Sequence, residues 1–467
     1  MYETAFVSSG ISTDGLTDLN SHHIVSTTGK SGCMPSRRGF TLSELLVAST
    51  IALSVMAAVA TLFGTFGRAA SDTQSIADMT NRLRMTASRL RRDLAGVTAP
   101  MRPPLSPDGN TGYFELIEGP LVDSTAAPTA PLLADVDDVL MFTTQSAGPP
   151  FQGRYVVSGS DRRIESSSAE VAWFCRASPA SAQTVAGLTL QTLYRRQLLV
   201  EGYVGAAPFH DPTSAATNQI TFAGTMPDLL NLYDMSLRAA GAGVFVPNTL
   251  SDLSMRQNRF LHGAWNVPFS TATPGATFDS SSGREGEDVV MTNVISFDVR
   301  VFDPDARPRL NGSIPVLPTD RVAGGYDALP AFSGTGSFSG CFVDLGTSTA
   351  DMATLVNGLW ITGTSPLTRP TNVKSRLVAP AHAPTYDTWS TTYETNGIDD
   401  DSDTIVDDAT NGADDSIPAD GLPDDAGETE TAPPYSAPLT AIEVRIRCYD
   451  PTSRQVRQAS IRHAFAN

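Results

Sequence analysis

Four aspartates in the C-terminal third of the chain have the spacing of a calcium-binding loop. They occupy positions 1, 3, 5 and 9 of a stretch that begins at Asp399, where hard oxygen ligands can gather around one Ca²⁺ ion. The stretch departs from that loop at its sixth position, Thr404 instead of glycine, and at its twelfth, Thr410 instead of glutamate. A structural Ca²⁺ site and a solvated acidic linker are both consistent with it. The candidate ligands are Asp399, Asp401, Asp403 and Asp407.

These aspartates lie in the most acidic segment of the chain. Residues 394–430 hold 14 acidic residues and no Lys or Arg, within a net charge of -18 for all 467 residues. The rest of the protein is therefore close to neutral. Nucleic acid is not expected as a partner, because phosphate binding needs a basic surface.

Other reactive side chains are scattered along the chain. No C-x-x-C pair occurs, and the histidines show neither His-x-x-x-His nor H-E-x-x-H spacing. We therefore expect buried thiols in strands, no catalytic set and no required cofactor. The cysteines are Cys33, Cys175, Cys341 and Cys448, and the isolated histidines are His210, His262, His382 and His463.

One carboxylate, Glu44, stands at the start of a long apolar run. The 22 residues Leu45–Phe66 carry no charge, which is about 33 Å of helix and enough to cross a bilayer core of about 30 Å. Arg37 and Arg38 precede the run, so the positive-inside rule places that end in the cytoplasm and the bulk of the chain outside the inner membrane. A carboxylate at such a position is usually functional; the alternative is one that snorkels to the headgroups.

The residues around Glu44 resemble a known processing signal. Residues 39–48 read GFTLSELLVA, which is similar to the prepilin signal of type IV pilins and type II secretion pseudopilins. The resemblance implies that a prepilin peptidase cuts between Gly39 and Phe40 and that Phe40 is then methylated. It makes Glu44 the fifth residue of the mature chain and the assembly residue. There it would pair with the N-terminal amine of a neighbouring subunit, an attraction that is strong in a low-dielectric helix bundle.

Residues 1–39 are then a leader that cleavage removes. Residues 34–39, MPSRRG, make a short basic leader if translation starts at Met34. Residues 1–33 have no periodic apolar pattern, as expected of either a misassigned start or a disordered cytoplasmic extension. We favour the misassigned start.

The element that positions these residues is a long helix over residues 40–96, membrane-spanning to about residue 66. Beyond the membrane its apolar residues recur at helical spacing, which predicts an amphipathic face packed on the exported domain. The helix is predicted to stop near Gly96, ahead of Pro100. The stripe consists of Ile76, Met79, Leu83, Ala87, Leu90 and Leu94.

The exported domain, residues 100–467, reads as short strands separated by turns. Candidate strands cover 138–144, 170–176 and 189–200, the last with room for an internal turn. Residues 295–304 and 442–451 align without a gap and alternate apolar with polar residues, as in strands covered on one face. They are either equivalent strands of a duplicated unit or neighbours in one sheet. The apolar face of the first holds Ile295, Phe297, Val299 and Val301.

The expected fold class is α+β, with a long N-terminal transmembrane helix packed on an antiparallel β-sheet domain that carries loop-rich insertions. One insertion is placed at about 205–290, with short helices at 228–238 and 249–262, and an acidic loop at about 394–430. The layout resembles the larger minor pseudopilins, of the J type in type II secretion or the W type in type IV pili. That second resemblance rests on residues 172–174, residues 193–196 and the last strand.

These features favour a minor pilin-like or pseudopilin subunit over an enzyme. Such a subunit would be processed by prepilin peptidase and assembled with other pilin subunits into a type II secretion pseudopilus or a type IV pilus. It would be a single-pass inner-membrane protein with a cytoplasmic N-terminus and a periplasmic C-terminal domain. The alternative is a membrane-anchored, exported, Ca²⁺-dependent binding or adhesion module that uses pilin-type processing only for export.

Overall fold

The computed structural model describes residues 39 to 466 apart from several segments. Those segments are 119–134, 158–159, 178–183, 186–187, 201–219, 224–228, 231, 242, 256–257, 261–283, 285, 305–308, 317–339, 346–384, 389 and 391–437. The chain divides into two compact units, an N-terminal unit (Met1–Gly67) and a sheet unit (Arg68–Asn467). Each unit is considered by itself.

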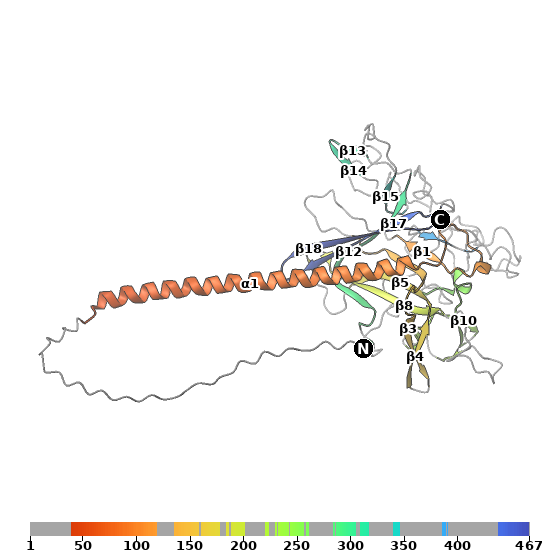
Figure 1. The fold of residues 1–467 in the computed structure, drawn as a ribbon, viewed down its shortest axis with the longest axis horizontal. Coiled ribbons are helices and arrows are strands. Elements are labelled where there is room, and N and C mark those ends of the chain that lie inside the picture. Colours follow the sequence, from red (N-terminus) through yellow and green to blue (C-terminus); the bar gives the residue numbers. More distant parts are fainter. Residues whose placement is uncertain are drawn as a thin grey trace, which may run out of the picture. The chain divides into compact units, whose positions relative to one another are not determined.

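A single long helix, α1 (Leu42–Ala95), contributes residues to both units. It ends one residue before Gly96, as predicted. In the sheet unit the predicted stripe is the buried face of α1, with Ile76 half-buried at its start. In Figure 1 this part of α1 runs alongside the strands of the sheet. The side chains that pack into the main hydrophobic core are Met79, Leu83, Ala87, Leu90 and Leu94.

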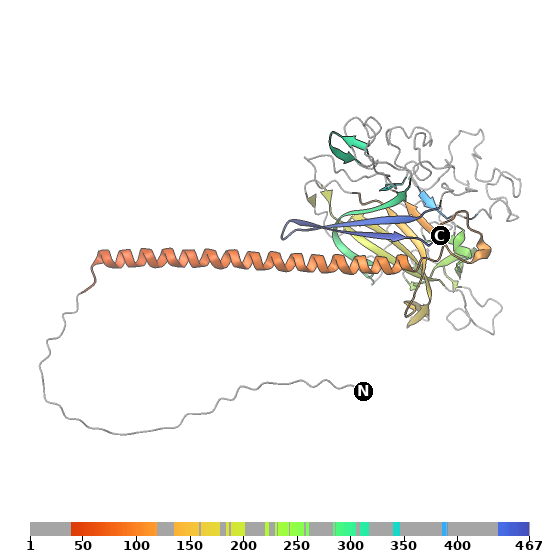
Figure 2. The same ribbon diagram turned by 45° about the horizontal axis from the view of Figure 1, so that its top comes forward.

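The described strands of the main sheet run in the order β16-β1-β2-β5-β8-β12-β17-β18, and β15 also pairs with β12. All their pairings are antiparallel, and the hairpin of β17 and β18 forms one end of the sheet (Figure 2). A helix on an antiparallel sheet confirms the α+β prediction. The bounds are β1 (Phe114–Ile117), β2 (Val139–Gln145), β5 (Ser168–Ala177), β8 (Gln191–Val200), β12 (Val289–Asp303), β15 (Cys341–Val343), β16 (Thr385–Asp387), β17 (Ala441–Asp450) and β18 (Gln455–Ala464).

Smaller elements surround this sheet. They are the hairpins β3 (Phe151–Val157) with β4 (Ser160–Ser166), β6 (Thr184–Val185) with β7 (Leu188–Thr189) and β13 (Arg309–Asn311) with β14 (Ile314–Val316), the sheet of β9 (Ile220–Thr221), β10 (Leu237–Gly241) and β11 (Val244–Pro247), and the 3₁₀ turns η1 (Pro107–Gly109) and η2 (Asp252–Ser254).

The two short helices expected at 228–238 and 249–262 are mostly wrong. In the first, Leu229, Leu230 and Leu232 form a short helical turn, with Tyr233 N donating to Leu229 O at 2.9 Å. The backbone then turns to β8, where Leu199 N donates to Asp234 O, and the chain continues as a strand. In the second, the described residues form the 3₁₀ turn η2 and a further 3₁₀ residue at Asn258, whose N donates to Met255 O at 3.2 Å. The Arg259 guanidinium takes the carbonyls of Leu253 and Ser254 that a longer helix would use.

The aligned segments 295–304 and 442–451 are neighbours in the sheet, within β12 and β17. They run antiparallel, so their apolar residues meet on one face. The interpretation as neighbouring strands is confirmed. The apolar pairs are Phe297 with Ile446, Val299 with Val444 and Val301 with Ile442.

One residue of the predicted apolar face lies on the other side. The register shifts between Val294 and Ser296, next to Asn293 with a left-handed φ of 58°. This bulge places Val294 in the main core and turns Ile295 to a separate small cluster with Leu190. A bulge inserts one extra residue, which reverses the alternation beyond it.

The expectation that these strands are covered on one side is also wrong. The polar face of β12 is buried as well, with Asp298 1% and Arg300 2% exposed. In β17, Glu443 is buried but Arg445 and Arg447 are half-buried. Arg300 Nε lies 3.0 Å from Asp298 Oδ2 and 3.2 Å from Asp344 Oδ1, so ionic contacts replace solvent on this face. The predicted strand 189–200 is interrupted at Leu190: Thr189 ends β7, and β8 begins at Gln191 and pairs with β5 along its whole length.

Two cysteines in the described strands fit the prediction of buried thiols, whereas Cys341 in β15 is only half-buried. Cys175 in β5 and Cys448 in β17 are buried and reduced. Burial raises the pKa of the Cys448 thiol to about 11 and that of Cys175 well above its ordinary value. Both are therefore neutral at neutral pH and poor nucleophiles.

Candidate processing and assembly site

The predicted cleavage point lies just ahead of α1 and is exposed. Gly39 and Phe40 precede the helix, and the Phe40 side chain is 86% exposed. A side chain at Gly39 would meet no described atom within 4 Å. The described residues of the chain therefore leave the Gly39–Phe40 peptide bond accessible to a peptidase.

Glu44 forms a capping box with Thr41 at the start of α1. Thr41 N donates to Glu44 Oε2 at 2.9 Å, and Glu44 N donates back to Thr41 Oγ1 at 3.3 Å. The Thr41 hydroxyl also donates to Glu44 Oε2 at 3.0 Å. This reciprocal pattern satisfies two backbone N–H groups that a helix start leaves without partners. Glu44 therefore stabilises its own helix in the single chain.

The capping box is a functional feature that the sequence reasoning missed. Its signal is the T-x-x-E spacing of Thr41 and Glu44, immediately before an apolar run. The structure thus brings the predicted site residues Gly39, Phe40 and Glu44 together at the first turn of one helix. It gives Glu44 hydrogen bonds within the chain, in addition to its predicted partner in a filament.

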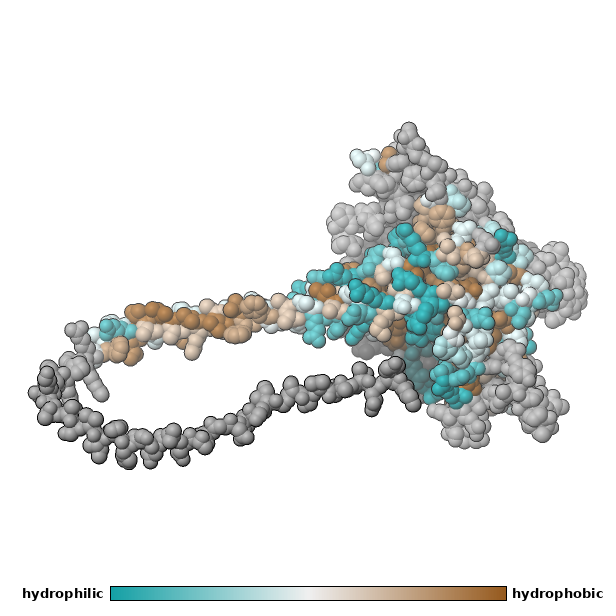
Figure 3. Space-filling model, viewed as in Figure 1, coloured by the Kyte–Doolittle hydropathy of each residue, from teal (hydrophilic) through white to brown (hydrophobic). Residues whose placement is uncertain are grey.

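The N-terminal part of α1 presents an apolar surface, shown in brown in Figure 3. An 18-residue window of the helix has a mean hydropathy of 2.2, and none of the window is buried. The helix is thus long and apolar enough to cross a membrane. Its exposed large apolar side chains up to residue 66 are Leu42, Leu45, Leu46, Val47, Ile51, Leu53, Val55, Met56, Val59, Leu62, Phe63 and Phe66.

The hydroxyl groups in this apolar segment are satisfied within the helix. Each donates to a backbone carbonyl three or four residues earlier, at 2.8 or 2.9 Å. Burying a hydroxyl without a hydrogen-bond partner in hydrocarbon costs free energy. These bonds therefore make the small polar residues compatible with a membrane. They are Ser49, Thr50, Ser54, Thr61 and Thr65.

A buried ionic cluster attaches the last turn of α1 to the sheet. Arg195 of β8 donates through Nε to Asp93 Oδ2 at 2.6 Å and through Nη2 to Asp93 Oδ1 at 2.9 Å. Trp173 Nε1 donates to the same Oδ2 at 3.0 Å. On the opposite face of β8, Arg196 pairs with Asp288 at 3.0 Å. The two adjacent arginines thus hold partners on both faces of the sheet.

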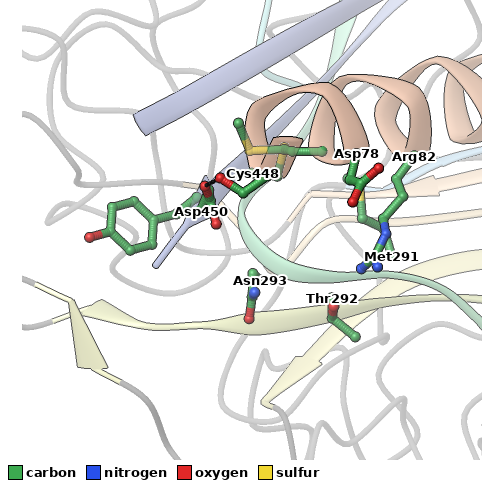
Figure 4. Close-up of a pocket in the computed structure, with 10 residues that line it drawn as sticks. Asp78, Arg82, Met291, Thr292, Asn293, Cys448 and Asp450 are labelled. Atoms are coloured by element: carbon green, nitrogen blue, oxygen red, sulfur yellow. Dashed lines mark hydrogen bonds between the residues drawn. The ribbon is translucent and has the colours of Figure 1, made fainter. Parts of the chain in front are cut away.

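A second contact joins α1 to the turn between β17 and β18. Ser75 Oγ donates to Asp450 Oδ2 at 2.6 Å. The contact borders a small open pocket of about 170 Å³, in which Asp78 and Arg82 of α1 lie near Asn293 and Asp450 (Figure 4). Burial alone acts to raise the pKa of Asp450, but hydrogen bonds from Ser453, Ser75 and Thr452 outweigh it and lower the pKa to about 2.

The predicted calcium ligands Asp399, Asp401, Asp403 and Asp407 lie outside the described residues. Calcium binding by the acidic segment therefore stays a prediction.

Comparison with known proteins bears on the N-terminal segment. Residues 34–60 match the family model described as "Prokaryotic N-terminal methylation motif". No curated protein and no solved structure shows a significant match to the chain. The matched residues include Gly39, Phe40, the capping box and the first part of the apolar run. This match supports pilin-type processing at the N-terminus, and the matched residues extend into the membrane-capable helix α1.

Proposed function

We propose that the chain is a minor pilin-like or pseudopilin subunit, of the J type of type II secretion or the W type of type IV pili. Prepilin peptidase cleaves it between Gly39 and Phe40, and α1 carries it from the inner membrane into a pseudopilus or pilus. The observation that carries this proposal is the methylation motif placed directly on a membrane-capable helix. Its work is assembly and protein contact, without turnover of a substrate.

Glu44 is the residue through which assembly is specified. Both Thr41 hydrogen bonds reach its Oε2 atom, and no described residue donates to Oε1. After cleavage the chain begins with the amine of Phe40. A carboxylate held at the first turn can accept a hydrogen bond through Oε1 from the N-terminal amine of a neighbouring subunit. Its Oε2 atom meanwhile keeps its own helix capped. Because unpaired charges are costly in hydrocarbon, this pairing favours one register between neighbouring helices.

The size of the sheet unit supports a minor position in the filament. The axes of packed helices lie about 8–10 Å apart. Each helix of this chain would carry a sheet unit that runs from Arg68 to Asn467. Domains of that size on every helix of a tightly packed bundle would crowd one another. A terminal or low-copy position avoids that crowding.

Mass spectrometry of the mature N-terminus tests the proposal. In cells that contain prepilin peptidase, the purified chain is expected to begin with N-methylated Phe40, whereas cells that lack the peptidase should yield the leader-bearing chain. A mature chain that begins elsewhere, or an unmethylated Phe40, would contradict the processing step. Cross-linking in the same cells should join the helix to other pilin subunits, and the identity of those subunits distinguishes a secretion pseudopilus from a pilus.

A further inference from the structure

A group of buried acids lies where β12 changes partners. Near its start β12 pairs with β8, and at its end it pairs with β15. Between these pairings, residues 135–138 lie beside the strand: Phe297 N donates to Asp135 O at 2.8 Å, and Val299 N donates to Asp138 Oδ2 at 2.7 Å. The segment just before β2 thus fills the interval between β8 and β15.

Three carboxylates converge at this point. Glu118 follows β1, and Asp135 and Asp138 precede β2. One carboxylate oxygen from each lies within 4.8 Å of the other two. Calcium binds oxygen at about 2.3–2.6 Å, so three oxygens with this spacing can contact the same ion. The residues are 3%, 0% and 0% exposed, respectively.

The side chain of Glu118 supplies an independent observation. Its Oε2 accepts a hydrogen bond from Leu345 N at 3.2 Å, whereas Oε1 is fully buried and accepts none from any residue that the structure describes. A buried oxygen without a donor costs about 1–3 kcal/mol, and more when it is charged. Among the described residues, none therefore donates to Glu118 Oε1, although this side chain belongs to the group of three converging carboxylates.

The surroundings add negative charge. Asp298 and Asp344 lie close enough to act on Glu118 and Asp135, and Arg300 contacts both of these outer aspartates. Burial, and then repulsion from neighbouring carboxylates, raises the pKa of Asp135 and that of Glu118 well above their ordinary values. Such a group is stable either with protons on its acids or with a cation between them.

We propose that Glu118, Asp135 and Asp138 bind one divalent cation of the calcium type. Three carboxylates from the ends of two strands suit Ca²⁺, which accepts varied geometry, better than Mg²⁺, which requires a strict octahedron. The ion ties the end of β1 and the start of β2 to the middle of β12. This site uses none of the predicted ligands Asp399, Asp401, Asp403 and Asp407, and it does not depend on the role of the chain in a filament.

Thermal unfolding of the purified full chain in detergent tests the site, with Ca²⁺ and with a chelator. By mass action, free Ca²⁺ at a hundred times its Kd is expected to raise the Tm of the wild type by about 5 °C. Mg²⁺ at the same concentration should raise it less. Glu118→Gln and Asp135→Asn should each abolish most of the Ca²⁺-dependent rise.

Glu118→Gln is expected to shift the Tm relative to the wild type in opposite directions with chelator and with Ca²⁺. A merely structural role would not produce this reversal. The amide oxygen can still accept the Leu345 N–H, while one buried negative charge is removed. In chelator this variant is expected to melt above the wild type, and in Ca²⁺ below it. Titration calorimetry should show one Ca²⁺ per chain at this site, measured in a background that carries Asn at 399, 401, 403 and 407.

Two control variants separate this site from other acids. Glu165→Gln removes an exposed carboxylate paired with Arg163 and should leave the Ca²⁺ response unchanged, as should the fourfold Asn variant of the acidic segment. The proposal is overturned if the wild type shows no Ca²⁺-dependent rise, or if the rise survives both Glu118→Gln and Asp135→Asn. Loss of the whole rise in the fourfold variant would overturn it as well, because the cation would then belong to the acidic segment.

Discussion

Asp93 of α1 and Arg195 of β8 form a two-pronged ion pair that connects the helix to the sheet. Arg195 Nε lies 2.6 Å from Oδ2 and Nη2 lies 2.9 Å from Oδ1, and each residue is 4% exposed. Trp173 donates to the same carboxylate. The pair fixes the rotation of the last helical turn against β5 and β8, because a rotated helix would bury both charges without partners.

Asp93→Asn is expected to lower the free energy of unfolding by about 3–5 kcal/mol, because it leaves a buried arginine without its counter-charge. Denaturant unfolding of the full chain in detergent, followed by tryptophan fluorescence, measures this loss. The matched control is Glu165→Gln, which breaks the exposed Arg163–Glu165 pair and should cost about 0–1 kcal/mol. Equal losses in the two variants would show that the buried pair does not hold the helix.

The sequence predicted those features of the fold whose signals are local. The stripe from Met79 to Leu94 and the end of α1 at Ala95 follow directly from helical periodicity and the Gly96–Pro100 stop signal. The alternation of Phe297, Val299 and Val301 in β12, beyond the bulge, was also predictable from the sequence. The bulge itself arises from the way the strand pairs with its neighbours, so the orientation of Ile295 could not be read from its own neighbours in the sequence.

The two candidate sites also differ in whether a local sequence pattern predicts them. Gly39, Phe40 and Glu44 form a contiguous motif, and the capping box was present as the spacing of Thr41 and Glu44. In contrast, the carboxylates Glu118, Asp135 and Asp138 are brought to β12 by the order of strands in the sheet. Because sheet order depends on contacts between distant segments, no local pattern could have indicated that they converge.

Gly96 is required where the chain leaves α1 and lies against the end of β2. A Cβ atom there would lie 2.2 Å from the carbonyl oxygen of Gln145 and 2.5 Å from Thr144 Oγ1. Gly96→Ala is therefore expected to lower the free energy of unfolding by about 1–3 kcal/mol, as other forced overpacking does. Gly148→Ala is the control, because a Cβ at Gly148 meets nothing within 4 Å. A neutral Gly96→Ala in denaturant unfolding would contradict the close approach of the two segments.

Asp450 should make the stability of the turn between β17 and β18 dependent on acid pH. Its folded pKa of about 2 lies below the value of about 4 in unfolded chains. The stabilising contribution is therefore fully present above about pH 4 and is lost as the pH falls toward 2. The difference in free energy of unfolding between the wild type and Asp450→Asn should be constant above this range and shrink below it. A difference that does not change with pH would show that the hydrogen bonds from Ser75 and Ser453 do not favour the charged form.

The final prediction separates the two roles of Glu44. Glu44→Gln keeps an oxygen that can accept from Thr41 but removes the charge, whereas Thr41→Ala removes the cap and keeps the charge. If the charge specifies assembly, Glu44→Gln should insert into the membrane normally and incorporate poorly into filaments. Thr41→Ala should lose about 0.5–2 kcal/mol of helix stability and incorporate nearly as well as the wild type. Membrane fractionation measures insertion, and the amount of chain in sheared filaments or cross-linked assemblies measures incorporation.

The opposite outcome is equally informative. If Thr41→Ala fails to incorporate and Glu44→Gln incorporates normally, the capping box is what assembly needs, because a frayed first turn cannot pack against its neighbour. Glu44→Ala removes the charge and the side chain that accepts from Thr41, but its backbone N–H can still donate to Thr41 Oγ1, so it should then show only part of the Thr41→Ala defect. If assembly requires the charge instead, Glu44→Ala should incorporate into filaments no better than Glu44→Gln. A carboxylate that only snorkels to the headgroups would leave incorporation unchanged in Glu44→Gln, since either side chain can reach the interface from the first turn of α1.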